Sequence, residues 1–158
     1  MQIETSGRVV GLHVNPQGGV PKHPVKRLEI AFQGCLGDRQ NDRKHHGGSQ
    51  RAVCFMFQEL MDELAHRGHP ISPGSTGENL LIQGLAHLQV HPGCVIQVGD
   101  VVLEVTGDAK PCKTIGSSFI EGSFHLLSHK KFPGNTRWYA KVITEGSVVL
   151  GDEVRLLQ

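Results

Sequence analysis

The stretch VIQVGDVVLEVT, residues 95–106, places two short apolar runs on either side of the dipeptide Gly99-Asp100. Alternation of apolar and polar side chains is typical of a β-strand with one buried face. A Gly-Asp pair between two such runs is a hairpin signal, because both residues tolerate the backbone angles of a tight turn. The stretch therefore predicts strands at Val95–Val98 and Val101–Thr106 that pair as a β-hairpin.

Similar patterns occur on both sides of this stretch. The further predicted strands are Arg8–Asn15, Val25–Gln33, Arg51–Met56, Tyr139–Thr144 and Glu153–Leu157. A second Gly-Asp pair, Gly151-Asp152, resembles the first and predicts another hairpin-type turn.

One segment has a helical period instead. Between Phe57 and Arg67 the apolar side chains recur every three to four residues, and Gly68 supplies a C-terminal stop. The segment Phe119–Lys131 predicts one or two short helices. Strands and helices do not alternate regularly, which disfavours a doubly wound parallel sheet. We predict a mainly β fold of the β-rich α+β class, a mostly antiparallel β-barrel with a few flanking helices and a single domain over residues 1–158.

Composition excludes several classes of protein. The chain has 158 residues and a formal net charge of +1, so a nucleic-acid binder driven by bulk charge is disfavoured. No apolar run reaches the roughly 18–20 residues of a membrane span, and the N-terminus does not read as a secretory signal. The four cysteines form no C-x-x-C pair. We therefore expect a cytoplasmic protein with reduced thiols.

The charge is distributed unevenly along the chain. Residues 8–51 hold eight Lys or Arg against three Asp or Glu, a net of +5, whereas residues 52–107 hold one against six, a net of −5. A basic segment rich in glycine suits a small anionic ligand better than a long polyanion, although a solvated basic face would give the same count.

Three segments in the first half of the chain carry candidate binding residues. Lys22 lies in the Gly- and Pro-rich loop of residues 18–25, and Arg39 follows a Gly-containing turn and offers a planar fork that matches phosphate. His45, His46, Gly47 and Gly48 come next; their backbone amides suit an anion, but adjacent histidines seldom face one metal, which disfavours zinc. Thr76, Glu78 and Asn79 precede the apolar run Leu80-Leu81-Ile82, where they either face a cleft or simply cap a strand.

Cys112 is the cysteine that the sequence marks as reactive. Lys110 and Lys113 flank it, and a helical turn is expected to follow; nearby cations and a helix N-terminus favour the thiolate form. Thiolate is both a nucleophile and a soft metal ligand. Cys54 lies in an apolar run, and Cys35 and Cys94 lie in turns without adjacent cations. The alternative for Cys112 is a buried, inert cysteine.

Taken in order, these segments resemble the MOSC domain, the C-terminal domain of molybdenum-cofactor sulfurases. The matching pieces are Gly19-Val20-Pro21-Lys22, Gly37-Asp38-Arg39, His46-Gly47-Gly48, Gly77-Glu78-Asn79-Leu80, Pro111-Cys112 and residues 146–152. The resemblance runs from about Val9 to Leu156. It implies a β-barrel with flanking helices and a molybdopterin-type molybdenum cofactor whose metal is bound by Cys112.

The resemblance implies more than one activity. Family members that act as oxidoreductases reduce N-hydroxylated compounds with electrons from a separate redox partner protein. The family is also proposed to act as a sulfur carrier, with a persulfide on this cysteine that a cysteine desulfurase would supply. A third possibility is a non-catalytic carrier of the cofactor. All three imply a small-molecule ligand and no nucleic acid or membrane.

The resemblance and the local chemistry together assign roles to individual residues. The candidates for holding the cofactor are Lys22, Arg39, His46, Gly47, Gly48, Thr76, Lys110 and Lys113. Asn79 would hold the pterin or position the substrate, and Glu78 or Asp108 would relay protons. Lys110 stands where many family members have Arg, so it keeps the charge but loses the planar fork.

Overall fold

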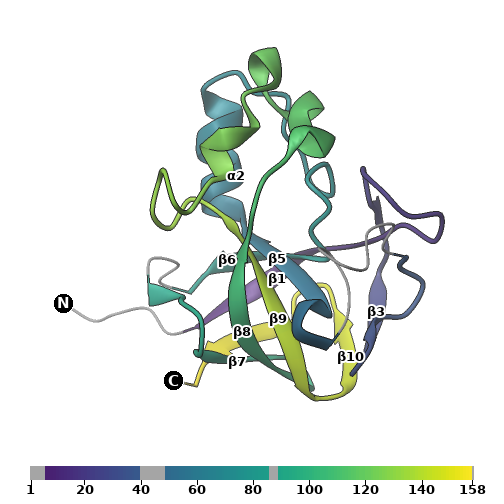
Figure 1. The fold of residues 1–158 in the computed structure, drawn as a ribbon. Coiled ribbons are helices and arrows are strands. Elements are labelled where there is room, and N and C mark those ends of the chain that lie inside the picture. The colour runs from purple at the N-terminus through teal and green to yellow at the C-terminus, as the bar shows by residue number, and fades with distance from the viewer. Residues whose placement is uncertain (1–5, 40–48, 86–88, 158) are drawn as a thin grey trace.

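Seven strands close into a barrel (Figure 1) in the computed structural model, which describes residues 6–39, 49–85 and 89–157. Around the barrel the order is β1 (Ser6–Val14), β6 (Leu80–Gly84), β5 (Val53–Phe57), β9 (Arg137–Thr144), β8 (Val101–Ala109), β7 (Val95–Val98) and β11 (Glu153–Leu156). Strand β11 pairs with β1 and closes the ring. The described barrel pairings are antiparallel except for β5 with β6. The predicted β-barrel is confirmed.

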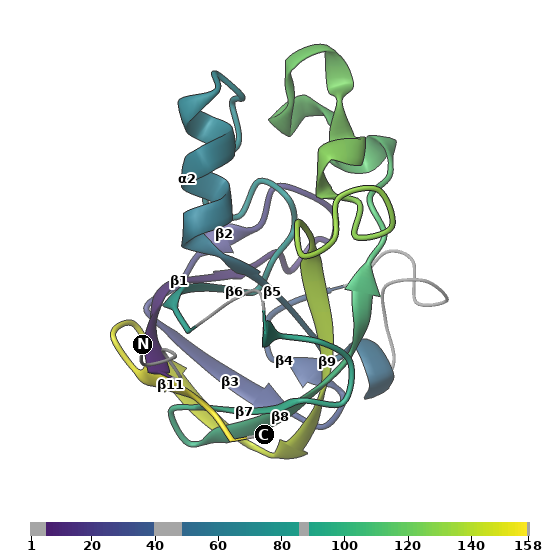
Figure 2. The same ribbon diagram turned by 90° about the vertical axis from the view of Figure 1, so that its left-hand side faces the viewer.

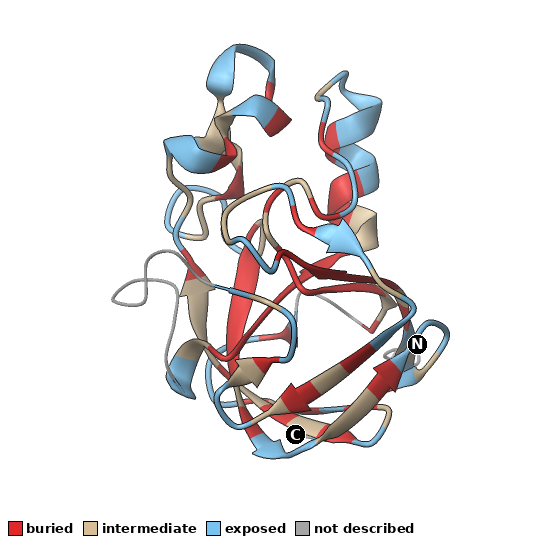
Figure 3. Ribbon diagram, turned by 90° about the vertical axis from the view of Figure 1, so that its right-hand side faces the viewer, coloured by how far each residue is buried: buried red, intermediate tan, exposed pale blue. Residues whose placement is uncertain are grey.

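The barrel interior follows from the period-two pattern of its strands. Along β5, Val53, Phe55 and Phe57 point into the main core, whereas Cys54 and Met56 belong to clusters on the outer face. Every residue of β5 is nevertheless buried, because other parts of the chain cover its outer face. Figure 3 shows buried strand segments in red between loops that are largely exposed.

A smaller sheet packs beside the barrel. Strand β3 (Arg27–Ala31) pairs with β10 (Gly146–Val149) on one side and β4 (Gly34–Cys35) on the other. Leu28 and Ile30 of β3, with Val148 of β10, are buried in the main core. Strand β2 (His23–Pro24) extends the barrel sheet from β1.

The predicted hairpin at Gly151-Asp152 is wrong, whereas the one at Gly99-Asp100 is confirmed by the pairing of β7 with β8. Strand β10 pairs with β3, and β11 pairs with β1 and β7. The turn between β10 and β11 is bound to β1 instead, because Gly151 N donates to Val9 O and Val9 N donates to Asp152 O. The turn therefore transfers the chain from the small sheet to the barrel.

Helical segments cover one end of the barrel, as Figures 1 and 2 show. The helix α2 (Gln58–His66) confirms the helix predicted from the apolar period, and its apolar stripe packs in a second core against Met56 and Leu81. The short 3₁₀ turns η3 (Lys113–Ser118), η4 (Ile120–Gly122) and η5 (Phe124–Leu127) complete this layer. A further turn, η1 (Ser49–Arg51), precedes β5 and lies beside the barrel, away from α2 (Figure 2). Within the described residues, no helix has the length and apolarity that crossing a lipid bilayer requires.

Candidate functional site

A row of paired residues crosses the outer face of the barrel from β1 to β8. His13 N donates to Asn79 O, and Asn79 N donates to Cys54 O. Cys54 is paired with Tyr139, and Tyr139 with Gly107. Directly paired residues on neighbouring strands share a face of the sheet. The segments that carry Glu78 and Cys112 therefore meet this one face, although they are far apart in the sequence.

The side chain of Asn79 forms three hydrogen bonds that hold the first part of this row together. Its Nδ2 donates to His13 O at 3.2 Å and to Asp38 Oδ2 at 2.9 Å, while its Oδ1 accepts from Cys54 N at 3.0 Å. The side chain is fully buried. Asn79 therefore links β1, β5 and the loop after β4, and its polar atoms are committed to the protein.

A buried ion pair lies over Asn79. Lys22, which is 8% exposed, binds Asp38 Oδ2, and Asp38 Oδ1 accepts from Asn15 N. Lys22 N also donates to Gly74 O. Because a carboxylate already neutralises its charge, Lys22 organises the loops of the site and is less available to an external anion. Arg39 is exposed, and its N donates to Asn15 O at the same loop junction.

Glu78 is enclosed by hydrogen bonds behind the same turn. Its Oε1 accepts from Thr76 Oγ1 at 2.6 Å, and its Oε2 accepts from Gly74 N at 2.7 Å. His13 Nδ1 lies 3.2 Å from Glu78 O, which can only accept, so this nitrogen carries the proton. Burial lowers the pKa of His13, and the Glu78 charge opposes this shift only in part. His13 is thus held neutral near pH 7.

Arg137 connects this turn to the segment that carries Cys112. Its Nη1 donates to Thr76 O at 2.8 Å, and its Nη2 donates to Ala109 O at 3.3 Å. Ala109 is the last residue of β8, three residues before Cys112. A second link lies nearby, because Ser118 Oγ at the end of η3 donates to Ser75 Oγ at 2.9 Å. Arg137 lies outside every motif of the sequence analysis, and its one local signal is a charged residue directly before the apolar Trp138 and Tyr139.

Cys112 differs from the other three cysteines in its exposure. Cys35, Cys54 and Cys94 are buried, whereas Cys112 is partly exposed, and its Sγ donates to Thr114 Oγ1 at 3.2 Å. Burial raises the pKa of the Cys54 thiol to about 11 and also raises that of Cys35 and Cys94. Cys112 is therefore the thiol that a ligand or reagent can reach.

The remaining predicted residues take different positions. Lys110 and Lys113 are exposed on either side of Cys112, and Asp108 is half-buried near the end of β8. Thr76, Glu78, Asn79 and Lys22 come together in the buried cluster described above. His45, His46, Gly47 and Gly48 lie outside the described residues. Within residues 6–39, 49–85 and 89–157, no three His, Cys, Asp or Glu side chains are grouped so that they could hold a metal ion.

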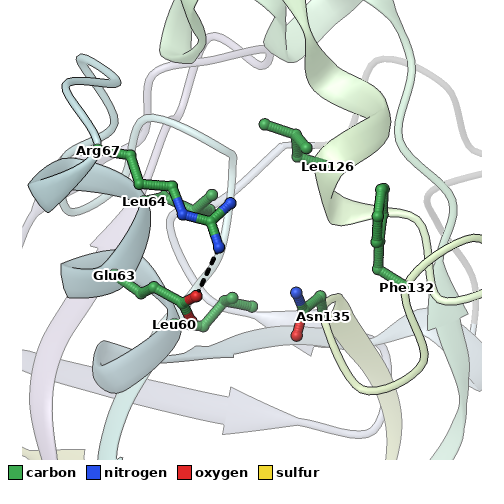
Figure 4. Close-up of a pocket in the computed structure, with 7 residues that line it drawn as sticks. All are labelled: Leu60, Glu63, Leu64, Arg67, Leu126, Phe132 and Asn135. Carbon is green, nitrogen blue, oxygen red and sulfur yellow. Dashed lines mark hydrogen bonds and ion pairs between the residues drawn. The ribbon is translucent and has the colours of Figure 1, made fainter.

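A separate pocket of about 100 Å³ lies between α2 and the chain from Leu126 to Asn135 (Figure 4). Leu60, Leu64 and Phe132 form apolar walls, and the Glu63–Arg67 ion pair lies at one side. None of the residues predicted for the site lines this pocket.

Comparison with known proteins identifies the family of this chain. The family model described as the MOSC domain matches residues 42–155, which is most of the chain. The chain belongs to the MOSC domain family. This family occurs in molybdenum-cofactor sulfurase-like proteins and is associated with the molybdenum cofactor.

Individual MOSC proteins give the degree of similarity. YflK of Bacillus subtilis is 31% identical over 143 residues, and YiiM of Escherichia coli is 28% identical over 125 residues. These alignments include 88% and 77% of this chain but only 63% and 55% of the two relatives, so the MOSC chain matches little more than half their length.

Solved structures show the same fold. The crystal structure of the YuaD protein from Bacillus subtilis matches with a TM-score of 0.77 at 19% identity, over 99% of this chain and 98% of that one. The crystal structure of YiiM from Escherichia coli matches with a TM-score of 0.69 at 23% identity, over 96% and 70%.

Proposed function

We propose that this MOSC domain binds a molybdenum cofactor through Cys112 and reduces N-hydroxylated small molecules. The observation that carries the proposal is the position of Cys112: of the four cysteines it alone is not buried, and two lysines flank it. An accessible sulfur beside cations is the donor expected for a soft metal in an anionic cofactor.

The described residues fit such a cofactor in a second respect. A molybdopterin-type group is anionic, and the buried guanidinium of Arg137 has no carboxylate partner among the described residues. Lys110 and Lys113 add positive charge on the solvent side of Cys112. Lys22 and Asn79 would support the site from within the protein, since both bind Asp38 and hold its loop in place.

When bound, the cofactor would supply the two-electron removal of oxygen from the substrate, which the protein alone cannot perform. The residues of the chain would bind, orient and supply protons. Both Glu78 oxygens accept hydrogen bonds inside the turn, so of the two predicted proton donors Asp108 is the more open one. A separate redox protein in the cytoplasm would donate the electrons.

The sulfur-carrier function uses the same exposed thiol and is the second candidate. In that reaction the outer sulfur of a desulfurase persulfide would pass to the Cys112 thiolate and leave the desulfurase cysteine as a thiolate. This candidate needs only an accessible cysteine, so the exposure of Cys112 supports it as well.

Purification from a host that makes molybdopterin separates these candidates. The proposed reductase converts a hydroxylamine-type substrate to the amine and water when a reductant is supplied, and the Cys112→Ser variant does not. A wild-type protein that carries no metal but gains one sulfur on Cys112 from a cysteine desulfurase, seen by mass spectrometry, would favour the carrier. Cofactor binding without turnover under any electron donor would favour a non-catalytic escort.

A further inference from the structure

Two half-buried histidines outside the candidate site accept hydrogen bonds from backbone amides. His69 Nδ1 accepts from Ile120 N at 3.1 Å, and His129 Nδ1 accepts from Gly134 N at 2.9 Å. A backbone N–H can only donate, so each Nδ1 must present a free lone pair, and the proton of the neutral ring lies on Nε2. Both hydrogen bonds therefore exist only while the two rings are uncharged.

Both hydrogen bonds hold parts of one segment, residues 113–135, which we call the cap. The cap consists of η3, η4, η5 and a loop, and it contains no α-helix or β-strand. Its apolar side chains Ile115, Phe119 and Leu127 are buried beside α2, whereas η4 and the middle of the loop at 130–133 are exposed. Exposed turns with few buried contacts open more easily than the core of a domain. The two histidines thus hold the least firmly packed parts of the cap.

His69 follows α2 and reaches across to η4. Its ring packs edge-on against Phe119, with the ring centroids 5.6 Å apart, and its Nδ1 holds the amide at which η4 begins. No ion pair among the described residues includes this ring. Protonation of Nδ1 would leave the Ile120 amide facing a second donor. The charged and titratable side chains of the neighbouring elements are all exposed: Glu63, His66 and Arg67 at the end of α2, and Glu121 on η4.

His129 lies in the loop after η5, and its ring packs edge-on against Trp138 of β9 with the centroids 5.1 Å apart. Its Nδ1 accepts from Gly134 at the far end of the same loop, so this bond closes the loop on itself. In the described part of the chain no carboxylate forms an ion pair with the ring. The charged side chains of the elements around the loop are Lys130 and Lys131 in the loop, Arg137 on β9, and the Glu63–Arg67 pair across the pocket in Figure 4.

We propose that His69 and His129 form a pH-sensitive latch that holds η4 and the loop of the cap closed at neutral pH and releases them in mild acid. Histidine is the side chain whose charge ordinarily changes between pH 5 and 8. The open segment takes up the proton without losing a hydrogen bond, so acid shifts the equilibrium towards opening. The cap begins directly after Cys112, but the latch requires neither molybdenum nor the proposed function.

NMR on the metal-free wild-type chain tests the latch at pH 7.5 and 5.5. At pH 7.5 the ring ¹⁵N shifts of His69 and His129 should show Nδ1 unprotonated and the proton on Nε2. At pH 5.5 the hydrogen-exchange protection factors of the Ile120 and Gly134 amides, corrected for the intrinsic exchange rates, should be roughly tenfold lower, because each donor has lost its acceptor.

Two variants assign the effect to the individual rings. His69→Asn and His129→Asn each keep a side-chain oxygen that can accept from the amide but does not titrate. In His69→Asn the protection of Ile120 should lose its pH dependence, while that of Gly134 keeps it. In His129→Asn the two amides should exchange these roles, so each variant is a control for the other and one folded variant suffices.

His125→Asn is the matched control, because it removes an exposed histidine from the same cap and should leave both pH dependences unchanged. His13 is present in every variant, so its effect on global stability in acid is common to all of them. Wild-type protection factors that do not differ between the two pH values, or a pH dependence that persists at the matching amide of either Asn variant, would overturn the proposal. A protonated Nδ1 on both rings at pH 7.5 would do the same.

Discussion

Replacing Asn79 by Ala tests the structural basis of the site. The change removes three hydrogen bonds at once, those with His13 O, Asp38 Oδ2 and Cys54 N. Each buried group that loses its partner costs about 1–3 kcal/mol, and Asp38 keeps Lys22, so the two groups left, His13 O and Cys54 N, give an expected loss of about 2–6 kcal/mol in the free energy of unfolding. This is a large part of the roughly 5–15 kcal/mol that stabilises an ordinary domain.

Urea unfolding followed by Trp fluorescence measures this loss, because the single tryptophan, Trp138, is 1% exposed in the folded chain. Gln83→Ala is the matched control: it removes an amide from the same strand, β6, whose Oε1 accepts only surface bonds from Arg8. We expect the control to change stability by less than about 0.5 kcal/mol. An Asn79→Ala variant whose free energy of unfolding lies within about 1 kcal/mol of the wild-type value would refute the structural role of these three hydrogen bonds.

The remaining predictions concern cysteine reactivity and pH. Iodoacetamide at pH 8 should modify one cysteine of the folded protein, Cys112, and all four after denaturation. Cys54 is buried, and its thiol, with a pKa of about 11, is only about 0.1% ionised at pH 8. Rapid modification of Cys54 in the folded protein, seen in mass spectra, would contradict this prediction. The free energy of unfolding of the wild type should fall as the pH drops below about 6.5, because the pKa of His13 is lower in the folded chain and the unfolded chain takes up the proton first. His13→Asn should reduce the slope of the free energy of unfolding against pH between pH 7.5 and 5.5, measured by urea titrations. An equal slope in both proteins would exclude His13 as its source.

The sequence predicts the parts of the fold that local patterns determine. The hairpin of β7 and β8 follows from a two-residue period of apolar side chains with a glycine at the turn. The helix α2 follows from a 3.6-residue period with a glycine after its end, so the sequence predicts both elements. The partner of β10 could not be found in this way. It pairs with β3, which lies more than a hundred residues earlier, and the turn at Asp152 is bound to Val9 rather than closing a hairpin.

In the candidate site, too, local patterns predict some features, whereas others depend on contacts between distant segments. Residue type and neighbours were enough to select Cys112, and its partial exposure agrees with that choice. The pairing of Lys22 with Asp38 depends on how two loops meet, so no local pattern distinguishes it from a free lysine. Arg137 was missed for a related reason: its importance lies in what surrounds it, two carbonyls and no carboxylate among the described residues, and this is a property of the folded chain.

The most direct test of the central claim is the molybdenum content of the purified protein. Wild type, Cys112→Ser and Cys54→Ser are expressed in a host that makes molybdopterin and examined by elemental analysis together with native mass spectrometry. If Cys112 holds the metal of the cofactor, wild type and Cys54→Ser carry about one molybdenum per chain and Cys112→Ser carries close to none. Folded wild-type protein without molybdenum, or a Cys112→Ser variant that retains it in full, would contradict the account.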